Sequence, residues 1–234
     1  ALAACTDLPL MADGDTGYGN AVSVYFTVQA FEDAGLSGLM IEDQVWPKRC
    51  GHMAGKAVIP AAEMVQKVKA AVDARRDDDF IIRARTDAAG PLGIDEAIDR
   101  LNLYAEAGAD ILFADALLTA EDIEKAARNV PKPLSVNMGL GIRSRPTTPL
   151  IHPKRLQEMG VHCVSYPRLL TTAAVKGMMN AMAAFNDMLS GDEPIDRPDL
   201  LVSFDELNAL TGFDELDRMD EKYSVAETIG HAAE

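Results

Sequence analysis

The chain is short of cysteine, of basic residues and of long apolar runs, and each shortage excludes a class of protein. Its three cysteines, Cys5, Cys50 and Cys163, are odd in number and far apart, so they indicate neither a disulfide framework nor a paired zinc motif, but a reducing, cytoplasmic setting. The net charge of -15 would repel nucleic acid and anionic membranes. No run approaches the ~18 apolar residues of a membrane span, and no signal peptide is recognisable.

What the chain does contain is enough apolar sequence for one sizeable core, since 48% of its 234 residues are apolar and 25% are charged. Short apolar runs alternate with amphipathic helical segments, which is the pattern of an α/β protein. The expected helices include residues 21–34, 60–75 and 94–107. The expected strands are residues 8–13, 38–43, 80–86, 111–115, 133–137 and 161–166.

Almost every predicted strand ends in a polar or charged residue, and in a parallel sheet these ends share one rim. A (β/α)8 barrel gathers its chemistry on that rim. Six βα units are two short of a closed barrel, so either a barrel lacks its first two units here or the sheet is open and doubly wound. The polar residues at the strand ends are Asp13, Glu42, Asp43, Arg85, Thr86, Asp87, Asp115, Asn137 and Tyr166.

The C-terminal part reads differently from the rest. Residues 171–189 form a helix rich in methionine and alanine, which packs in a core or against a neighbouring chain. Ser203 and Glu206 form a capping box that opens a further helical segment, and Gly212 stops it. We therefore predict a catalytic unit at residues 1–190, followed at 191–234 by a linker and a helical extension.

Two segments carry chemistry. Residues 48–52 read Lys-Arg-Cys-Gly-His, and these cationic neighbours favour the thiolate of Cys50. Asp13 and Asp15 offer two carboxylates on a glycine-rich turn, which suits a metal ion. The alternative interpretations are a small buried cysteine and a solvated turn.

Further along, Arg85 suits bidentate binding of a carboxylate, and Asn137 suits a neutral hydrogen bond. Alternatively, Arg85 belongs to a structural ion pair and Asn137 caps a turn or helix. Tyr18 either shapes the pocket or anchors its own loop.

Together these motifs resemble the isocitrate lyase and phosphoenolpyruvate mutase superfamily. The form KRCGH is similar to the lyase branch, which includes methylisocitrate lyase and 2,3-dimethylmalate lyase, whereas the phosphonate branch lacks that cysteine. The matching segments are residues 13–19 (DGDTGYG), 41–44 (IEDQ), 48–52 (KRCGH), 84–88 (ARTDA), 108–110 (GAD) and 148–150 (TPL).

The resemblance implies a (β/α)8 TIM-type barrel, here beginning just before its third strand, in a homotetramer that swaps a helix between subunits. Residues 171–189 are the candidate for that helix. It also implies Mg²⁺, with Mn²⁺ as the alternative. Asp13 would ligate the ion directly, and Asp15 and Glu42 would hold its bound waters.

The resemblance further implies that Cys50 protonates the departing fragment, aided by Lys48, Arg49 and His52. The residues expected to contact the substrate are Arg85, Asn137, Asp115, Tyr18, Gly51 and Thr148.

The implied activity is Mg²⁺-dependent carbon–carbon cleavage of a 2-hydroxy di- or tricarboxylate to pyruvate, or a related 2-oxo acid, plus a carboxylate. The substrate would be 2-methylisocitrate, 2,3-dimethylmalate or another 2-alkylmalate. The choice stays open because the family usually carries Glu where this chain has Asp115, and a Glu-Gly-Gly-like loop where it has residues 139–146. The alternatives are an oxaloacetate hydrolase, a noncatalytic module that binds a 2-oxo acid, and a purely structural oligomer.

Overall fold

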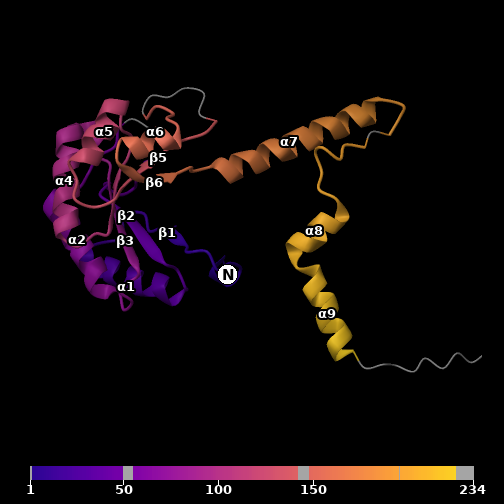
Figure 1. Cartoon of the computed structure of the whole chain (residues 1–234), viewed down its shortest axis with the longest axis horizontal. Helices are drawn as coiled ribbons and strands as arrows, with labels where there is room; N and C mark the ends of the chain where they lie inside the picture. Colours follow the sequence, from indigo (N-terminus) through magenta and orange to yellow (C-terminus); the bar gives the residue numbers. More distant parts are fainter. Residues whose placement is uncertain (1, 50–54, 142–147, 195, 225–234) are drawn as a thin grey trace, which may run out of the picture. The chain divides into compact units, whose positions relative to one another are not determined.

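The computed structural model describes residues 2–49, 55–141, 148–194 and 196–224, and the chain divides into two compact units, Ala1–Leu169 and Leu170–Glu234. The first unit contains one sheet of six parallel strands (Figure 1). These strands are β1 (Met11–Asp13), β2 (Gly38–Glu42), β3 (Ile81–Thr86), β4 (Ile111–Ala114), β5 (Leu134–Asn137) and β6 (Val161–Ser165). All six lie where the sequence predicts a strand, although β1 is three residues shorter at its start.

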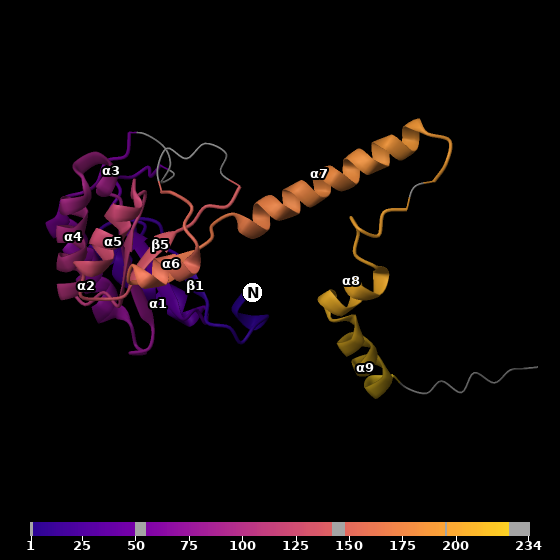
Figure 2. The ribbon, with the colours of Figure 1, turned by 45° about the horizontal axis from the view of Figure 1, so that its top comes forward.

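Helices connect the strands and lie along one face of the sheet (Figure 2). Their starts follow local rules: the side chain of Asn20 accepts hydrogen bonds from the N–H groups of Val22 and Ser23, and Thr119 caps its helix in the same way. These elements are η1 (Leu2–Ala4), α1 (Ala21–Asp33), α2 (Ala61–Ala74), α3 (Ala89–Leu92), α4 (Ile94–Glu106), α5 (Ala120–Arg128) and α6 (Pro153–Glu158).

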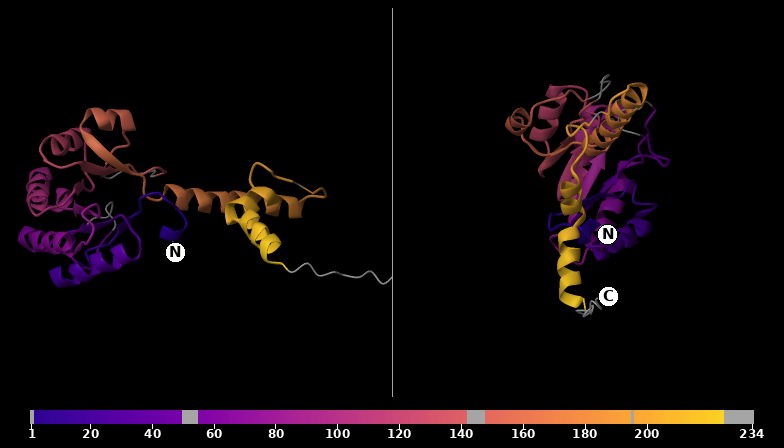
Figure 3. Two further views of the ribbon diagram at one scale, coloured as in Figure 1. Left: turned by 60° about the horizontal axis from the view of Figure 1, so that its bottom comes forward. Right: turned by 90° about the vertical axis from the view of Figure 1, so that its right-hand side faces the viewer.

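The strand order settles the choice between the two predicted architectures. The strands run β1 to β6 across the sheet in sequence order, so the order never reverses as it does in a doubly wound fold. With helices on the outer face only, the sheet curls into a six-stranded part of a TIM-type barrel (Figure 3). The barrel prediction is confirmed, and the doubly wound alternative is wrong.

The hydrophobic core lies between the outer face of the sheet and its helices. Leu39 and Ile41 of β2 are about 1% exposed, and Val28, Met64 and Leu101 of the covering helices are fully buried. Each such side chain contributes on the order of 1.5–3 kcal/mol when buried. The core therefore fixes the sheet and leaves its carboxyl-end rim to polar residues.

The second unit contains α7 (Leu169–Ser190), which starts in the first unit, α8 (Phe204–Thr211) and α9 (Phe213–Tyr223). The predicted capping box of Ser203 and Glu206 is present, and Gly212 ends α8 in the left-handed conformation. None of the residues described between 170 and 224 is buried. The predicted domain boundary after residue 190 stays a prediction. Within the described residues, no helix combines the length and apolar character needed to cross a bilayer.

One buried carboxylate ties the rim to a helix. Asp43 follows β2 and is fully buried. Its oxygens accept hydrogen bonds from Thr86 Oγ1 (2.7 Å), the N–H of Asp87 (2.9 Å), Arg100 Nη1 (3.1 Å) and Tyr104 OH (2.7 Å). Burial raises the pKa of Asp43, and these hydrogen bonds oppose that shift. Asp43 thus joins the ends of β2 and β3 to α4.

Replacing Tyr104 with Phe tests this assembly. The change removes one donor to a buried carboxylate with little change in volume, so we expect the free energy of unfolding to fall by about 2 kcal/mol. Urea denaturation followed by circular dichroism measures it. Tyr223→Phe, at a site 70% exposed, is the control and should leave stability unchanged. Equal stability of the two variants would contradict the assigned role of Asp43.

Candidate active site

The loop that follows β2 leaves the rim and returns to it as two neighbouring arms. The N–H of Val45 donates to the carbonyl oxygen of Ala57 (2.8 Å), and Gln44 and Val58 form an antiparallel bridge. The Gln44 amide holds Arg49 at both ends, accepting from its N–H (2.9 Å) and donating to its carbonyl oxygen (3.0 Å). The base of this loop is therefore fixed by backbone pairing. Cys50, Gly51 and His52 lie outside the described residues.

Four predicted residues meet at the Lys48 ammonium, and we call them the Lys48 cluster. Lys48 Nζ lies 3.6 Å from Asp13 Oδ2 and 3.6 Å from Glu42 Oε1, and it forms its closest ion pair with Asp15. The turn itself holds the two aspartates together, because Asp13 Oδ1 accepts from the N–H of Asp15 (2.9 Å). The cluster therefore draws on three segments. Asp13 and Asp15 come from the end of β1 and the turn after it, Glu42 from the end of β2, and Lys48 from the loop after β2.

Glu42 is the most perturbed member of the Lys48 cluster. Its side chain is 1% exposed, and burial raises its pKa to about 7 against the opposing charges of Arg85 and Lys48. Oε1 accepts a hydrogen bond from Gln44 Nε2 (3.1 Å), whereas Oε2 is buried without a hydrogen-bond partner. Burial alone would lower the pKa of Lys48, but its hydrogen bond to Asp15 and the charges of Glu42 and Asp13 raise it. The cluster has more negative than positive charge to satisfy.

This donor set fits a hard divalent cation. Three carboxylates already surround one positive nitrogen, and Glu42 Oε2, which accepts no hydrogen bond and lies 3.4 Å from Arg85 Nε, has capacity for a further partner. Among the described residues, no group of three or more His, Cys, Asp or Glu side chains is arranged to ligate one metal ion together. Mg²⁺ does not need such a cage, because it binds one or two carboxylates and keeps several waters.

A second group of charges lies beside the first, and we call it the Arg85 cluster. Arg85 donates to both oxygens of Asp87 (2.8 and 3.0 Å) and to Asp115 Oδ2 (2.8 Å). Lys56 Nζ lies 2.8 Å from Asp87 Oδ1 and 3.7 Å from Asp115 Oδ2. Asn137 Nδ2 donates to Asp115 Oδ1 (3.1 Å). The alternative interpretation of Arg85, a structural ion pair, describes these contacts, and its binding to a substrate stays a prediction.

The charges in the Arg85 cluster set one another's protonation. Burial would lower the pKa of Arg85, but Asp115 and Asp87 outweigh it and raise the pKa. Burial raises the pKa of Asp115, while Arg85 and Lys56 hold the pKa of Asp87 below its usual value. Arg85 is therefore cationic at any working pH.

Sequence reasoning missed two members of the Arg85 cluster. Lys56 lies in no motif with a functional interpretation. Asp87 is one of several polar residues near the strand ends, and nothing in the pattern assigns it a role of its own. A signal existed for Asp87, because a buried strand-end arginine needs a carboxylate and residue 87 lies two positions later. Lys56 offered no such signal.

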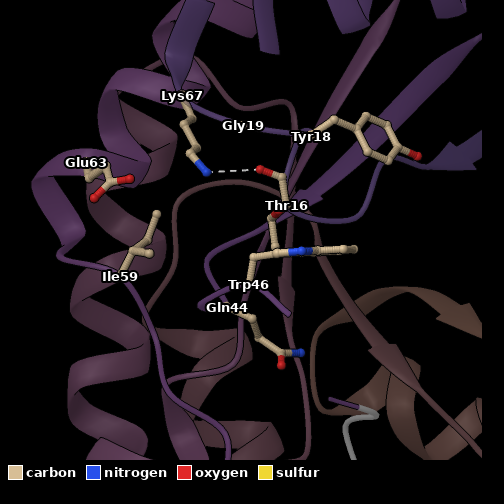
Figure 4. A pocket seen from close by; sticks show the side chains of 8 residues that line it. All are labelled: Thr16, Tyr18, Gly19, Gln44, Trp46, Ile59, Glu63 and Lys67. Atoms are coloured by element: carbon tan, nitrogen blue, oxygen red, sulfur yellow. Dashed lines mark hydrogen bonds between the residues drawn. The ribbon is translucent and has the colours of Figure 1, made fainter. Parts of the chain in front are cut away.

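A cavity of about 450 Å³ opens between the loops after β1 and β2 and helix α2 (Figure 4), and Gln44, which donates to Glu42 of the Lys48 cluster, is one of its lining residues. Lys67, on its wall, donates to the carbonyl oxygen of Thr16 (3.0 Å). The predicted residue Tyr18 also lines it and is 54% exposed, but Asp13, Asp15 and Glu42 do not line it. Thr148 lies apart from the cavity, buried in the loop before α6.

Two related sequences cover most of this chain. The 2,3-dimethylmalate lyase of Eubacterium barkeri is 38% identical over 224 residues, which are 96% of this chain and 75% of that protein. A protein named probable 2-methylisocitrate lyase 2, from Corynebacterium glutamicum, is 45% identical over 181 residues, which are 77% of this chain and 58% of that protein. This chain thus spans only part of the length of each.

Solved structures share the fold. A 2,3-dimethylmalate lyase, titled a PEP mutase/isocitrate lyase superfamily member, has a TM-score of 0.80 and 30% identity and covers 97% of this chain and 73% of its own. An oxaloacetate acetylhydrolase with 3,3-difluorooxalacetate has a TM-score of 0.80 and 29% identity (92% and 70% covered). A phosphonopyruvate hydrolase with oxalate and Mg²⁺ has a TM-score of 0.79 and 29% identity (95% and 75% covered).

The family model described as phosphoenolpyruvate phosphomutase matches residues 1–186. This match confirms the resemblance inferred from the motifs, and it agrees with the related sequences and structures. The chain belongs to the phosphoenolpyruvate phosphomutase family, within the PEP mutase/isocitrate lyase superfamily.

Proposed function

We propose that this chain is a Mg²⁺-dependent lyase that cleaves a carbon–carbon bond in a 2-hydroxy di- or tricarboxylate. The substrate is 2-methylisocitrate, 2,3-dimethylmalate or another 2-alkylmalate, and the products are pyruvate or a related 2-oxo acid plus a carboxylate. The observation that carries the proposal is the convergence of Asp13, Asp15 and Glu42 on Lys48. The similarity to a 2,3-dimethylmalate lyase and a 2-methylisocitrate lyase supports it.

The reaction divides the substrate into an oxygen end and a carbon end. The 2-hydroxyl group gives its proton to a base, and its oxygen forms the C2=O double bond of the 2-oxo acid as the bond from C2 to C3 breaks. The electron pair of that bond moves to C3, which then takes up a proton. Mg²⁺, or Mn²⁺ in its place, would stabilise the negative charge that develops on the oxygen end. Asp13 would hold the ion, with Asp15 and Glu42 holding its waters.

Cys50 is the proposed acid that protonates C3. Lys48 and Arg49 precede it in sequence, and the Gln44 amide fixes the backbone of Arg49 (2.9 and 3.0 Å). Lys48 carries a permanent positive charge at the Asp15 end of the site. Such cations favour the thiolate form and so make the thiol proton easier to give up. His52 and Gly51 complete this segment in the proposal.

The Arg85 cluster is the proposed site for the substrate carboxylates. Arg85 supplies the positive charge and Asn137 a neutral donor, and Asp115 orients both of them through bonds of 2.8 and 3.1 Å. Tyr18 and Thr148 would shape the ends of the site.

Assembly into a homotetramer with a swapped helix is part of the proposal. The apolar side chains of α7 support it, since Met178, Met182 and Phe185 are 48–61% exposed within this chain.

Oxaloacetate hydrolysis is the second candidate, because the chain superposes on an oxaloacetate acetylhydrolase with a TM-score of 0.80. The two reactions give different products. We expect 2-oxo acid release from at least one 2-substituted malate when the full-length protein is tested with Mg²⁺ and assayed by chromatography. Oxalate plus acetate from oxaloacetate, with no malate cleaved, would support the hydrolase instead. Oxalate binding without either turnover would indicate a noncatalytic module.

Replacing Cys50 with Ser tests the proton donor. A serine hydroxyl is a far weaker acid, so we expect kcat to fall about 10²–10⁴-fold. Oxalate and Mg²⁺ binding by calorimetry should persist. Cys5→Ser, at an exposed site, is the control and should retain full activity. Full activity in Cys50→Ser would remove Cys50 from the mechanism.

Replacing Lys48 with Met tests the cation site. The change removes the positive charge that lies among the three carboxylates and would compete with a cation there. We therefore expect Mg²⁺ to bind about tenfold more tightly by calorimetry. Turnover should fall, since the acid loses a cationic neighbour. Lys69→Met removes the same charge from an exposed position of α2 and should leave Mg²⁺ affinity unchanged. Weaker Mg²⁺ binding in Lys48→Met would place the ion elsewhere.

A further inference from the structure

Lys56 lies on the returning arm of the loop after β2 and is one of the most buried lysines described. Its side chain is 5% exposed, and its ammonium faces Asp87 at 2.8 Å and Asp115 at 3.7 Å, which are 0% and 4% exposed. A charge so poorly solvated persists only with close partners. Lys56 is therefore a built part of the rim and not a surface cation.

Lys56 shares both of its carboxylates with Arg85. Arg85 Nη2 donates to Asp87 Oδ1 at 3.0 Å, the same atom that Lys56 contacts, and to Asp115 Oδ2 at 2.8 Å. Two cations thus alternate with two carboxylates, and these four charges sum to zero. Arg85 Nε also lies 3.4 Å from Glu42 Oε2, which is counted with the Lys48 cluster. Without Lys56, Arg85 would be the one nearby cation for two buried carboxylates among the contacts described.

The arm that carries Lys56 is fixed independently of these charges. The N–H of Ile59 donates to the carbonyl oxygen of Asp43 (2.9 Å), and Val45 pairs with Ala57 (2.8 Å). A side chain added at Gly55 would begin 3.1 Å from Arg49 Nη1, so the two arms lie against each other. The backbone therefore delivers the ammonium to the Arg85 cluster at a set position.

We propose that Lys56 is a positioning residue that keeps Arg85 available to a substrate carboxylate by neutralising Asp87 and Asp115. The inference rests on the proposed function, in which Arg85 binds that carboxylate. An incoming carboxylate takes the neutral cluster to a charge of -1. Without Lys56 it would take the cluster to -2 in a poorly solvated site, where repulsion between like charges is strong.

The test compares Lys56→Met with the parent protein by calorimetry with oxalate in the presence of Mg²⁺. We expect oxalate affinity to fall by about tenfold or more, the order that one missing unit charge produces in such a site. Lys56→Arg restores the charge and should recover most of the affinity. Lys125→Met is the charge-matched control: Lys125, on α5, pairs with Asp95 on α4 and lies outside the Arg85 cluster. It should bind oxalate as the parent does.

Kinetics separate positioning from folding. If the parent cleaves a malate, Lys56→Met should raise KM by a similar factor while kcat at saturation changes less, and its melting curve stays cooperative. Lys56→Gln provides a second neutral variant if Lys56→Met does not fold.

The outcomes are distinct. Parental oxalate affinity in Lys56→Met or Lys56→Gln would overturn the inference and leave the proposed lyase intact. Oxalate binding that depends on Lys56, without cleavage of any malate, would support the inference and overturn the lyase. A parent that neither binds oxalate nor cleaves a malate would overturn both.

Discussion

The structure of the rim depends on one fully buried carboxylate, that of Asp43. A carboxylate without water must receive hydrogen bonds from the protein, and four groups supply them: Thr86, the N–H of Asp87, Arg100 and Tyr104. Its neighbour in sequence, Glu42, belongs to the Lys48 cluster, and two of the residues that bind it, Thr86 and Asp87, directly follow Arg85. Asp43 therefore links the strand end that carries Glu42 to the strand end that carries Arg85 without belonging to either cluster.

The two clusters differ in formal charge, and the difference agrees with the ligands proposed for them. The Lys48 cluster has three carboxylates and one ammonium, which gives -2 when Glu42 is ionised. The Arg85 cluster has two cations and two carboxylates, which gives zero. A divalent cation would balance the charge of the first cluster, and the second cluster would accept a substrate carboxylate at lower electrostatic cost. The clusters meet where Arg85 Nε lies 3.4 Å from Glu42 Oε2. A ligand that spans both clusters would therefore contact one region with excess negative charge and one that is formally neutral.

The sequence predicts the strands and their polar ends because both follow from local pattern. It places Asp13 and Asp15 in one segment and Glu42 and Lys48 in two others, and the parallel topology brings these three segments to one rim. Pairing across the rim is different in kind. Arg85 donates to Asp87 and Asp115, and Lys56 contacts the same two carboxylates. These contacts depend on the directions in which side chains leave three different loops. Periodicity and spacing carry no information on those directions. The apolar run also predicts a start for β1 that is too early. Leu8 is 74% exposed and lies outside the strand, so an apolar residue in the run is not necessarily a buried one.

The motifs that carry the family resemblance do not all belong to the rim. Asp110, from residues 108–110, accepts hydrogen bonds from Arg75 Nη1 (2.8 Å) and the N–H of Ile82 (2.8 Å), at the opposite end of the strands. Its place in the motif thus reflects folding. Asp115 stands between the two kinds of role: it is buried and directs Arg85 and Asn137. Both of its oxygens already accept hydrogen bonds. In the proposed function, Asp115 would therefore influence substrate choice through the two donors that it orients, and an Asp in place of the family's Glu would shift those donors rather than a direct contact with the substrate.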